Sequence, residues 1–131
     1  MITIRPEIPL DYSAIFEVNN LAFGKENEPR LVEIQRHSPD FTPELSLVAV
    51  LEDQVVGYIL FSPVVIEKSG GGISILALAP MAVRPEFQNQ GIGSELVRQG
   101  LEACRRFGCR MVVVLGHSHF YPRFGFEPAG L

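Results

Sequence analysis

Apolar positions in the first third of the chain switch from the period of a strand to the period of a helix. Residues 2–5 alternate apolar and polar side chains, which predicts a first strand. Apolar residues then recur at near-helical spacing up to Gly24, and Asp11 is a candidate N-cap for this helix. A weaker helical pattern follows and stops at Ser38-Pro39, because a proline disfavours helical geometry in the residue before it.

The middle of the chain has the pattern of β-hairpins. Residues 45–51 and 55–61 are two apolar runs separated by the turn sequence Glu52-Asp53-Gln54. The glycine-rich residues 69–72 predict a hairpin loop. Residues 73–83 are almost entirely apolar, which is typical of a strand that is buried on both faces. Pro80 lies inside this strand and has no N–H to donate, so we expect a bulge or an unpaired edge there.

The strongest helical pattern covers residues 91–107, whose apolar side chains form one stripe, and Gly108 is placed to end the helix. A short apolar strand is expected at residues 111–115. This order of elements predicts a single α/β domain over residues 1–131. Its central sheet should be mixed, mostly antiparallel, and flanked by helices.

Composition and charge narrow the classes of function. Hydrophobic residues make up 47% of the chain, which is typical of a globular protein, and the net charge of −4 argues against a nucleic-acid partner. Cys104 and Cys109 are too few for a disulfide framework and match no zinc pattern, so we expect reduced thiols and no metal site. No apolar run approaches the length of about 20 residues that a membrane helix needs, and no signal peptide is evident. We therefore expect a cytoplasmic protein without a membrane partner.

A candidate phosphate-binding loop connects the strand at 73–83 to the long helix. Glycines at a helix N-terminus let an anion approach unpaired backbone N–H groups. A P-loop is excluded because no Gly-Lys-Ser/Thr sequence is present, and a dinucleotide fingerprint is excluded because Leu96 stands where the third glycine would be. The remaining pattern, Gln88-x-x-Gly91-x-Gly93, is weak alone, and glycines that only shape the turn are an alternative.

The run Met81-Ala82-Val83-Arg84-Pro85-Glu86-Phe87-Gln88-Asn89-Gln90-Gly91-Ile92-Gly93 resembles the acetyl-CoA-binding motif of the Gcn5-related N-acetyltransferase (GNAT) family. The tail Phe120-Tyr121-Pro122-Arg123-Phe124-Gly125-Phe126 is similar to a second marker of that family. The order of elements also agrees, so the resemblance covers almost the whole chain. It implies a GNAT-like fold and an N-acetyltransferase that uses acetyl-CoA as cosubstrate and a primary amine as acceptor.

The resemblance assigns cofactor-binding roles to two neighbouring segments. The cofactor's pyrophosphate would be held by the loop residues, namely Gln88, Asn89, Gln90, Gly91, Ile92 and Gly93. The pantetheine arm would pair with the strand end like an added strand, at Met81, Ala82 and Val83. Disturbed pairing near Pro80 would leave N–H and C=O groups free for such an arm, although an ordinary bulge would give the same local geometry.

Catalytic roles follow less completely from the resemblance. Tyr121 matches the tyrosine that protonates the departing thiolate of coenzyme A, and packing within the aromatic tail is the alternative role. The motif strand and the following strand carry no acidic residue to act as base. His117 is the preferred candidate base, His119 is a weaker one, and a water chain is a third possibility. The acceptor pocket could be lined by Phe23, Glu26, Asn27 and Glu28.

The chain stops five residues after Phe126, where the family normally adds one or two strands. We therefore expect the last strand or strands of the sheet to be lacking, and an exposed edge of this kind would favour a homodimer. Two alternatives to an enzyme remain. One is a module that binds acyl-CoA without turnover, and the other is a subunit of a larger assembly.

Overall fold

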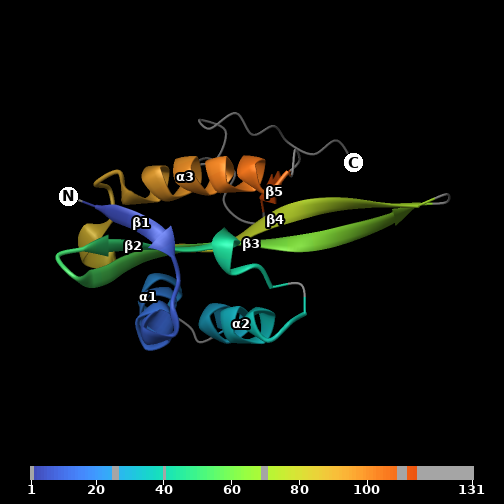
Figure 1. The fold of residues 1–131 in the computed structure, drawn as a ribbon. Coiled ribbons are helices and arrows are strands. Elements are labelled where there is room, and N and C mark those ends of the chain that lie inside the picture. The colour runs from blue at the N-terminus through green and yellow to red at the C-terminus, as the bar shows by residue number, and fades with distance from the viewer. Residues whose placement is uncertain (1, 25–26, 40, 69–70, 109–111, 115–131) are drawn as a thin grey trace.

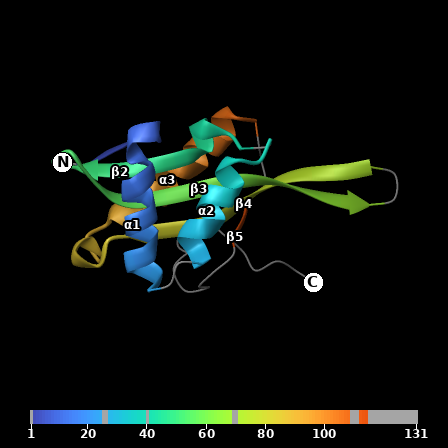
Figure 2. The same ribbon diagram turned by 90° about the horizontal axis from the view of Figure 1, so that it is seen from below.

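The described part of the chain forms a five-stranded sheet with helices on both faces (Figures 1 and 2). The computed structural model describes residues 2–24, 27–39, 41–68, 71–108 and 112–114. In chain order the elements are β1 (Thr3–Pro6), α1 (Tyr12–Phe23), α2 (Asn27–Arg36), β2 (Ser46–Leu51), β3 (Gln54–Lys68), β4 (Gly71–Val83), α3 (Ile92–Arg106) and β5 (Val112–Val114). Short 3-10 turns cover Pro9–Asp11, Pro43–Leu45 and Pro85–Phe87.

The strands lie in the sheet in their chain order, from β1 to β5. Each pair from β1 to β4 is antiparallel, whereas β5 runs parallel to β4 after the crossover through α3. The predicted fold class is therefore confirmed: a mixed, mostly antiparallel sheet flanked by helices.

Alternating side chains of β3 face two different apolar cores. Tyr58 and Leu60 pack with residues of α1 and α2, including Ile15, Val18 and Val32. Ile59 and Phe61 point to the opposite face and pack with α3. Figure 1 shows this arrangement, with α3 above the sheet and α1 and α2 below it. Because successive side chains of a strand point to opposite faces, β3 packs against the helices on both sides of the sheet.

A bulge interrupts the pairing of β3 and β4 where the sequence predicts it. Ile59 pairs with Met81 and Phe61 with Leu78, so Ala79 and Pro80 together lie opposite Leu60. Beyond the bulge β4 still pairs with β3, up to Gly57 opposite Val83. The pairing described between β4 and β5 ends at Leu78 opposite Val114. Within the described chain, residues 81–83 are therefore paired along one edge only.

One local expectation is corrected, and a second is confirmed only in position. The glycine-rich loop is shorter than expected, because Gly71 and Gly72 pair with Lys68 and Glu67 and so belong to β4. Glycine keeps its N–H and C=O groups, so it can extend a ladder despite its poor strand propensity. Asp11 occupies the N-cap position of α1, as predicted, but its side chain forms no hydrogen bond with this helix.

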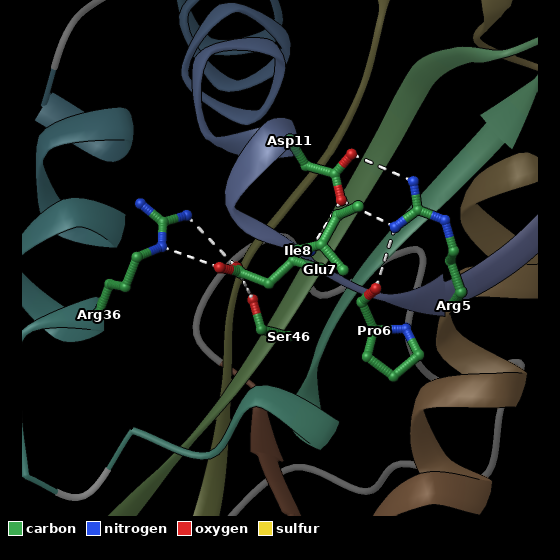
Figure 3. A network of polar contacts seen from close by, with 7 residues as sticks. All are labelled: Arg5, Pro6, Glu7, Ile8, Asp11, Arg36 and Ser46. Carbon is green, nitrogen blue, oxygen red and sulfur yellow. Dashed lines mark hydrogen bonds and ion pairs between the residues drawn. The ribbon is translucent and has the colours of Figure 1, made fainter.

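The Asp11 carboxylate instead turns back towards the end of β1 (Figure 3). It accepts a hydrogen bond from the Ile8 N–H at 2.8 Å and two from the Arg5 guanidinium, at 2.8 and 3.1 Å. The hydrogen bond from Arg5 is the main cause of the lowered pKa of Asp11. Burial acts in the opposite direction, and the hydrogen bond from the Ile8 N–H lowers this pKa further. The carboxylate makes no bond to α1 because a nearby arginine offers it a charged partner.

We expect Asp11→Asn to be less stable than the wild type at neutral pH, with the difference shrinking in acid. A carboxyl whose pKa is lower in the folded state stabilises it above the unfolded pKa of about 3.9, and this contribution is lost as pH falls through the folded pKa. Urea unfolding at pH 7 and pH 3 measures both values. Asp53→Asn, in the exposed β2–β3 turn, is the control; an equal effect of both variants would contradict the role of Asp11.

Gly100 lets α3 pack directly on the ring of Phe61. A Cβ atom at position 100 would lie 2.7 Å from Cζ of Phe61, closer than real Cβ contacts. Phe61 is fully buried, so its ring cannot move aside freely. This close approach fixes the distance between α3 and the sheet.

Gly100→Ala should therefore destabilise the protein by about 1–3 kcal/mol, because overpacking forces the ring or the helix to shift. The gain in helix propensity, about 1 kcal/mol, opposes this loss only in part. Thermal unfolding measures the result. A melting temperature equal to or above that of the wild type would contradict the tight packing.

Candidate functional site

A loop connects β4 to α3. Two of its residues have a left-handed backbone conformation, which turns the chain back towards the sheet. Asn89 has φ of +64° and Gly91, the N-cap of α3, has φ of +85°. Asparagine and glycine are the residues that best tolerate this region. Because Phe87 packs against the core under α3, the loop is also held from its apolar side.

Polar contacts within the loop fix its shape. Gln88 donates from Nε2 to the Val83 carbonyl at 3.0 Å, and Gln90 donates to the Glu86 carbonyl at 3.3 Å. The Arg84 N–H donates to the Val56 carbonyl at 2.8 Å, so the start of the loop stays tied to β3. Gln88 therefore closes the loop onto the end of β4.

The start of α3 has the properties of an anion site. The Glu95 N–H makes the first helical bond, to the Gly91 carbonyl at 3.1 Å, so the N–H groups of the turn before it have no partner in the helix. The positive end of the helix dipole lies at the same place. A Cβ at Gly91 would meet no described atom within 4 Å, so a ligand could approach this backbone.

The N-terminus of α3 lies close to the sheet because β3 has a glycine beneath it. A Cβ at Gly57 would be 3.0 Å from Leu96 Cδ1 and 3.3 Å from Ile92 Cγ2. Gly57 also pairs with Val83, the last residue of β4. The glycine thus keeps the end of β4 next to the start of α3.

Side-chain charge near the loop is largely compensated. Arg84 forms ion pairs with Glu17 of α1 at 3.2 Å and with Glu86 at 3.3 Å. The Arg84 Nε atom is buried and has no partner among the described residues. An anion on the loop would therefore be held mainly by backbone N–H groups rather than by a free cation.

The structure brings the predicted cofactor segments together. Met81, Ala82 and Val83 end β4, Gln88 to Gly91 form the loop, and Ile92 and Gly93 begin α3. Among the acceptor-pocket candidates, Phe23 ends α1, while Asn27 and Glu28 begin α2. Tyr121, His117, His119 and Glu26 lie outside the described residues.

A buried polar network that the sequence did not reveal lies on the α1 and α2 face (Figure 3). Arg36, at the end of α2, donates from Nε and Nη2 to the two carboxylate oxygens of Glu7, at 2.9 and 3.3 Å. The Glu7 side chain is 2% exposed and that of Arg36 is 9% exposed. A buried pair with two parallel hydrogen bonds fixes the relative position and orientation of the two side chains. These residues are 29 positions apart, so no local spacing pattern connects them.

The network continues from Glu7 across the sheet. The Ser46 hydroxyl donates to Glu7 Oε1, and Ser46 Oγ lies 2.7 Å from the Tyr58 hydroxyl. A serine hydroxyl has one proton, so Tyr58 must donate to Ser46. Burial raises the pKa of Tyr58 far above its usual value, which keeps this proton in place. Tyr58 pairs with Ala82, so the network ends beneath the last residues of β4.

The last turn of α2 is also attached to two further elements. The Arg36 guanidinium carbon lies 3.9 Å from the centre of the Tyr12 ring, at the start of α1. Ser62 of β3 donates to Gln35 Oε1 at 2.7 Å. Gln35 and Arg36, which are consecutive in α2, thus contact β3, α1 and Glu7, the residue that follows β1. These contacts position α2 under the β3–β4 hairpin (Figure 2).

A separate pocket of about 300 Å³ lies at the opposite end of α3. Its lining includes Arg5, Glu44, Gln99, Arg106 and Phe107. It does not contain the loop residues or the end of β4. Neither segment of the predicted cofactor site contributes to it.

In the part of the chain that the structure describes, no group of three histidine, cysteine, aspartate or glutamate side chains could hold a metal ion. None of the described helices is long and apolar enough to cross a membrane.

Comparison with known proteins gives consistent matches. A model of the Acetyltransferase (GNAT) family matches residues 12–126. The chain is 43% identical over 118 residues to the uncharacterized N-acetyltransferase YjhQ of Escherichia coli K12, a match that covers 90% of this chain. It is 39% identical over 127 residues to the uncharacterized N-acetyltransferase YhbS of the same strain, which covers 96% of this chain and 74% of YhbS. The chain spans 65% of the length of YjhQ.

Two solved structures share both fold and sequence with the chain. A GNAT family acetyltransferase from Brucella melitensis, in complex with acetyl-CoA, has a TM-score of 0.88 and 38% identity. That match covers 98% of this chain and 84% of the Brucella chain. YhbS from Escherichia coli, in complex with CoA, has a TM-score of 0.86 and 37% identity, covering 96% of this chain and 68% of that one.

Proposed function

This chain belongs to the Acetyltransferase (GNAT) family, and from that premise we propose that it transfers the acetyl group of acetyl-CoA directly to a primary amine. The observation that carries the proposal is the junction of β4 and α3. In the described chain, the end of β4 is paired along one edge only. Beside it, the N-terminus of α3 carries Gly91, where the open space around the backbone leaves room for an anion. The complexes of the Brucella relative with acetyl-CoA and of YhbS with CoA support the choice of ligand.

The two segments would hold different parts of the cosubstrate. Backbone N–H groups at Gly91, Ile92 and Gly93 would bind the pyrophosphate, since they lie at the positive end of the α3 dipole. Gln88, Asn89 and Gln90 complete this loop. The backbone of Met81, Ala82 and Val83 would pair with the amide groups of the pantetheine arm, as a peptide adds to a sheet edge.

The proposed reaction is a direct displacement at the thioester. The amine nitrogen attacks the carbonyl carbon, a C–N bond forms, and the C–S bond breaks with its electron pair passing to sulfur. Tyr121 would give its proton to the thiolate, and His117 or water would accept the proton that the amine loses. The protein's main contribution would be to hold both reactants in the correct orientation.

A second candidate function is binding of acyl-CoA without turnover. The observation that favours it is the composition of β4, Gly71–Val83, which carries no acidic side chain that could act as a base. The cosubstrate-binding features are the same in both candidates, so only turnover separates them.

Thermal unfolding with acetyl-CoA tests cosubstrate binding. We expect millimolar acetyl-CoA to raise the melting temperature, because a ligand that binds only the folded state stabilises it by about 2.7 kcal/mol at 100 times its dissociation constant. Gly91→Asp should abolish this rise, since a carboxylate would stand where the pyrophosphate binds.

The matched control is Gly108→Asp at the other end of α3. Both glycines have positive φ and open space around the Cβ position, so both variants carry a similar backbone strain. Gly108→Asp should keep the full rise with acetyl-CoA. The absence of any rise in the wild type, or a full rise in Gly91→Asp, would refute the assignment.

Tyr121→Phe tests the proposed role of Tyr121 as the general acid. We expect kcat to fall by about 10²–10⁴, the usual contribution of a positioned acid, with little change in the KM of acetyl-CoA. Release of the free thiol measures the rate, and Phe120→Leu controls for a general disturbance of the aromatic tail. Unchanged kcat would refute the acid role, whereas wild type and variant equally inert towards amines would favour the binding module.

A further inference from the structure

Gln35 and Ser62 form a polar pair between α2 and β3. The Ser62 hydroxyl donates to Gln35 Oε1 at 2.7 Å, and both side chains are partly exposed. On this face of β3, Leu60 packs with α1 and α2, and the buried network of Glu7, Arg36, Ser46 and Tyr58 lies nearby. Unlike that network, the pair of Gln35 and Ser62 is partly exposed, so a small molecule could reach it.

The pair lies beside the part of β4 where the proposed thioester would be. Ser62 pairs with Ala77, two residues before the bulge formed by Ala79 and Pro80. A pantetheine arm that started at α3 and paired with residues 81–83 would run back along β4 towards this bulge. At about 3.3 Å per residue, the bulge is about 10 Å from Val83. On the sheet face that carries α3, the close packing of Gly100 on Phe61 leaves no space for the acceptor. The acceptor would therefore approach from the opposite face, on which Ser62 lies.

The chemistry of the pair favours a neutral oxygen atom as its ligand. A glutamine side chain has two N–H donors on Nε2, and the bond from Ser62 uses only its oxygen. The neighbouring charge, Arg36, is neutralised by Glu7. Among the described residues nothing accepts a hydrogen bond from Gln35 Nε2, so these donors would bind a carbonyl or hydroxyl oxygen of a ligand without an ion pair.

We propose that Gln35 is a specificity-determining residue that binds an oxygen of the acceptor next to its amine, and that Ser62 holds the Gln35 side chain in place for this contact. The acceptor class is then an amine with a neighbouring carbonyl or hydroxyl group, such as an amino-acid amide or a peptide N-terminus, rather than an alkylamine or polyamine. This inference rests on the proposed acetyl transfer and identifies its second substrate.

Glycinamide and isobutylamine test the proposal, because they have nearly the same shape and only glycinamide carries the oxygen. Rates are compared per concentration of free amine, by release of the CoA thiol. In the wild type kcat/KM should favour glycinamide by about tenfold or more, the effect of one hydrogen bond to a fixed donor. In Gln35→Leu the ratio should fall below about threefold, and Ser62→Ala should lower it partly because Gln35 loses its anchor.

The control variant is Gln99→Leu, on α3 at the other face of the sheet, which should keep the wild-type ratio. The KM of acetyl-CoA should stay within about twofold in every variant, because the proposed cofactor segments are not touched. Three results would overturn the inference: equal use of both amines by the wild type, an unchanged ratio in Gln35→Leu, or no turnover of either amine. Equal use of both amines leaves acetyl transfer intact, whereas loss of the acetyl-CoA thermal shift would refute the proposed function itself.

Arg36 acts on this pair as a positioning residue. Its bidentate bond to Glu7 fixes the turn that carries Gln35. Arg36→Lys keeps the positive charge but cannot form the two parallel hydrogen bonds to Glu7. The KM of glycinamide should therefore rise at least threefold, while the KM of acetyl-CoA is unchanged. A lower melting temperature with an unchanged KM for glycinamide would show that Arg36 is only structural.

Discussion

The pairing of β4 is the constraint on which the proposed site depends. Pro80 has no N–H group, and together with Ala79 it lies opposite the single residue Leu60. Before this bulge β4 is paired with β3 and β5, and after it the described pairing involves β3 alone. The same strand is therefore a central strand of the sheet at Leu78 and available for an added strand at residues 81–83. The glycine at position 57 then keeps α3 close enough for both segments to act on one ligand.

The opposite face of the sheet depends on a different interaction, the buried pair of Glu7 and Arg36. Removing one partner of such a pair costs about 3–5 kcal/mol, because the other charge is left buried without compensation. Ser46 and Tyr58 extend the pair to the residue beside Ala82, while Tyr12 stacks against Arg36. The helices on this face are thus positioned by directional bonds, whereas α3 is positioned by close apolar packing. A wall fixed by directional bonds can hold a polar group such as Gln35 at a defined place.

Local patterns in the sequence predicted most of the fold and one half of the candidate site. The strands, the three helices and the bulge at Pro80 follow from periodicity, from glycine and proline chemistry, and from the missing proline N–H. The loop from Gln88 to Gly93 was found because its residues are contiguous and its glycines have a physical use. The network of Glu7, Arg36, Ser46 and Tyr58 was missed because its members are brought together only by the folded sheet. Asp11 occupies the predicted N-cap position of α1, but the helical pattern did not reveal that its carboxylate binds Arg5 instead of the helix.

Hydrogen exchange of the backbone amides, with and without acetyl-CoA, tests the central claim that the end of β4 and the start of α3 together form the cosubstrate site. We expect new protection at residues 81–83 and 91–94, with no change in β1 and β2. Unchanged exchange at these two segments would contradict this claim. Protection at the distant pocket near Arg5 and Phe107 in their place would contradict it equally, because that pocket shares no residue with the proposed site.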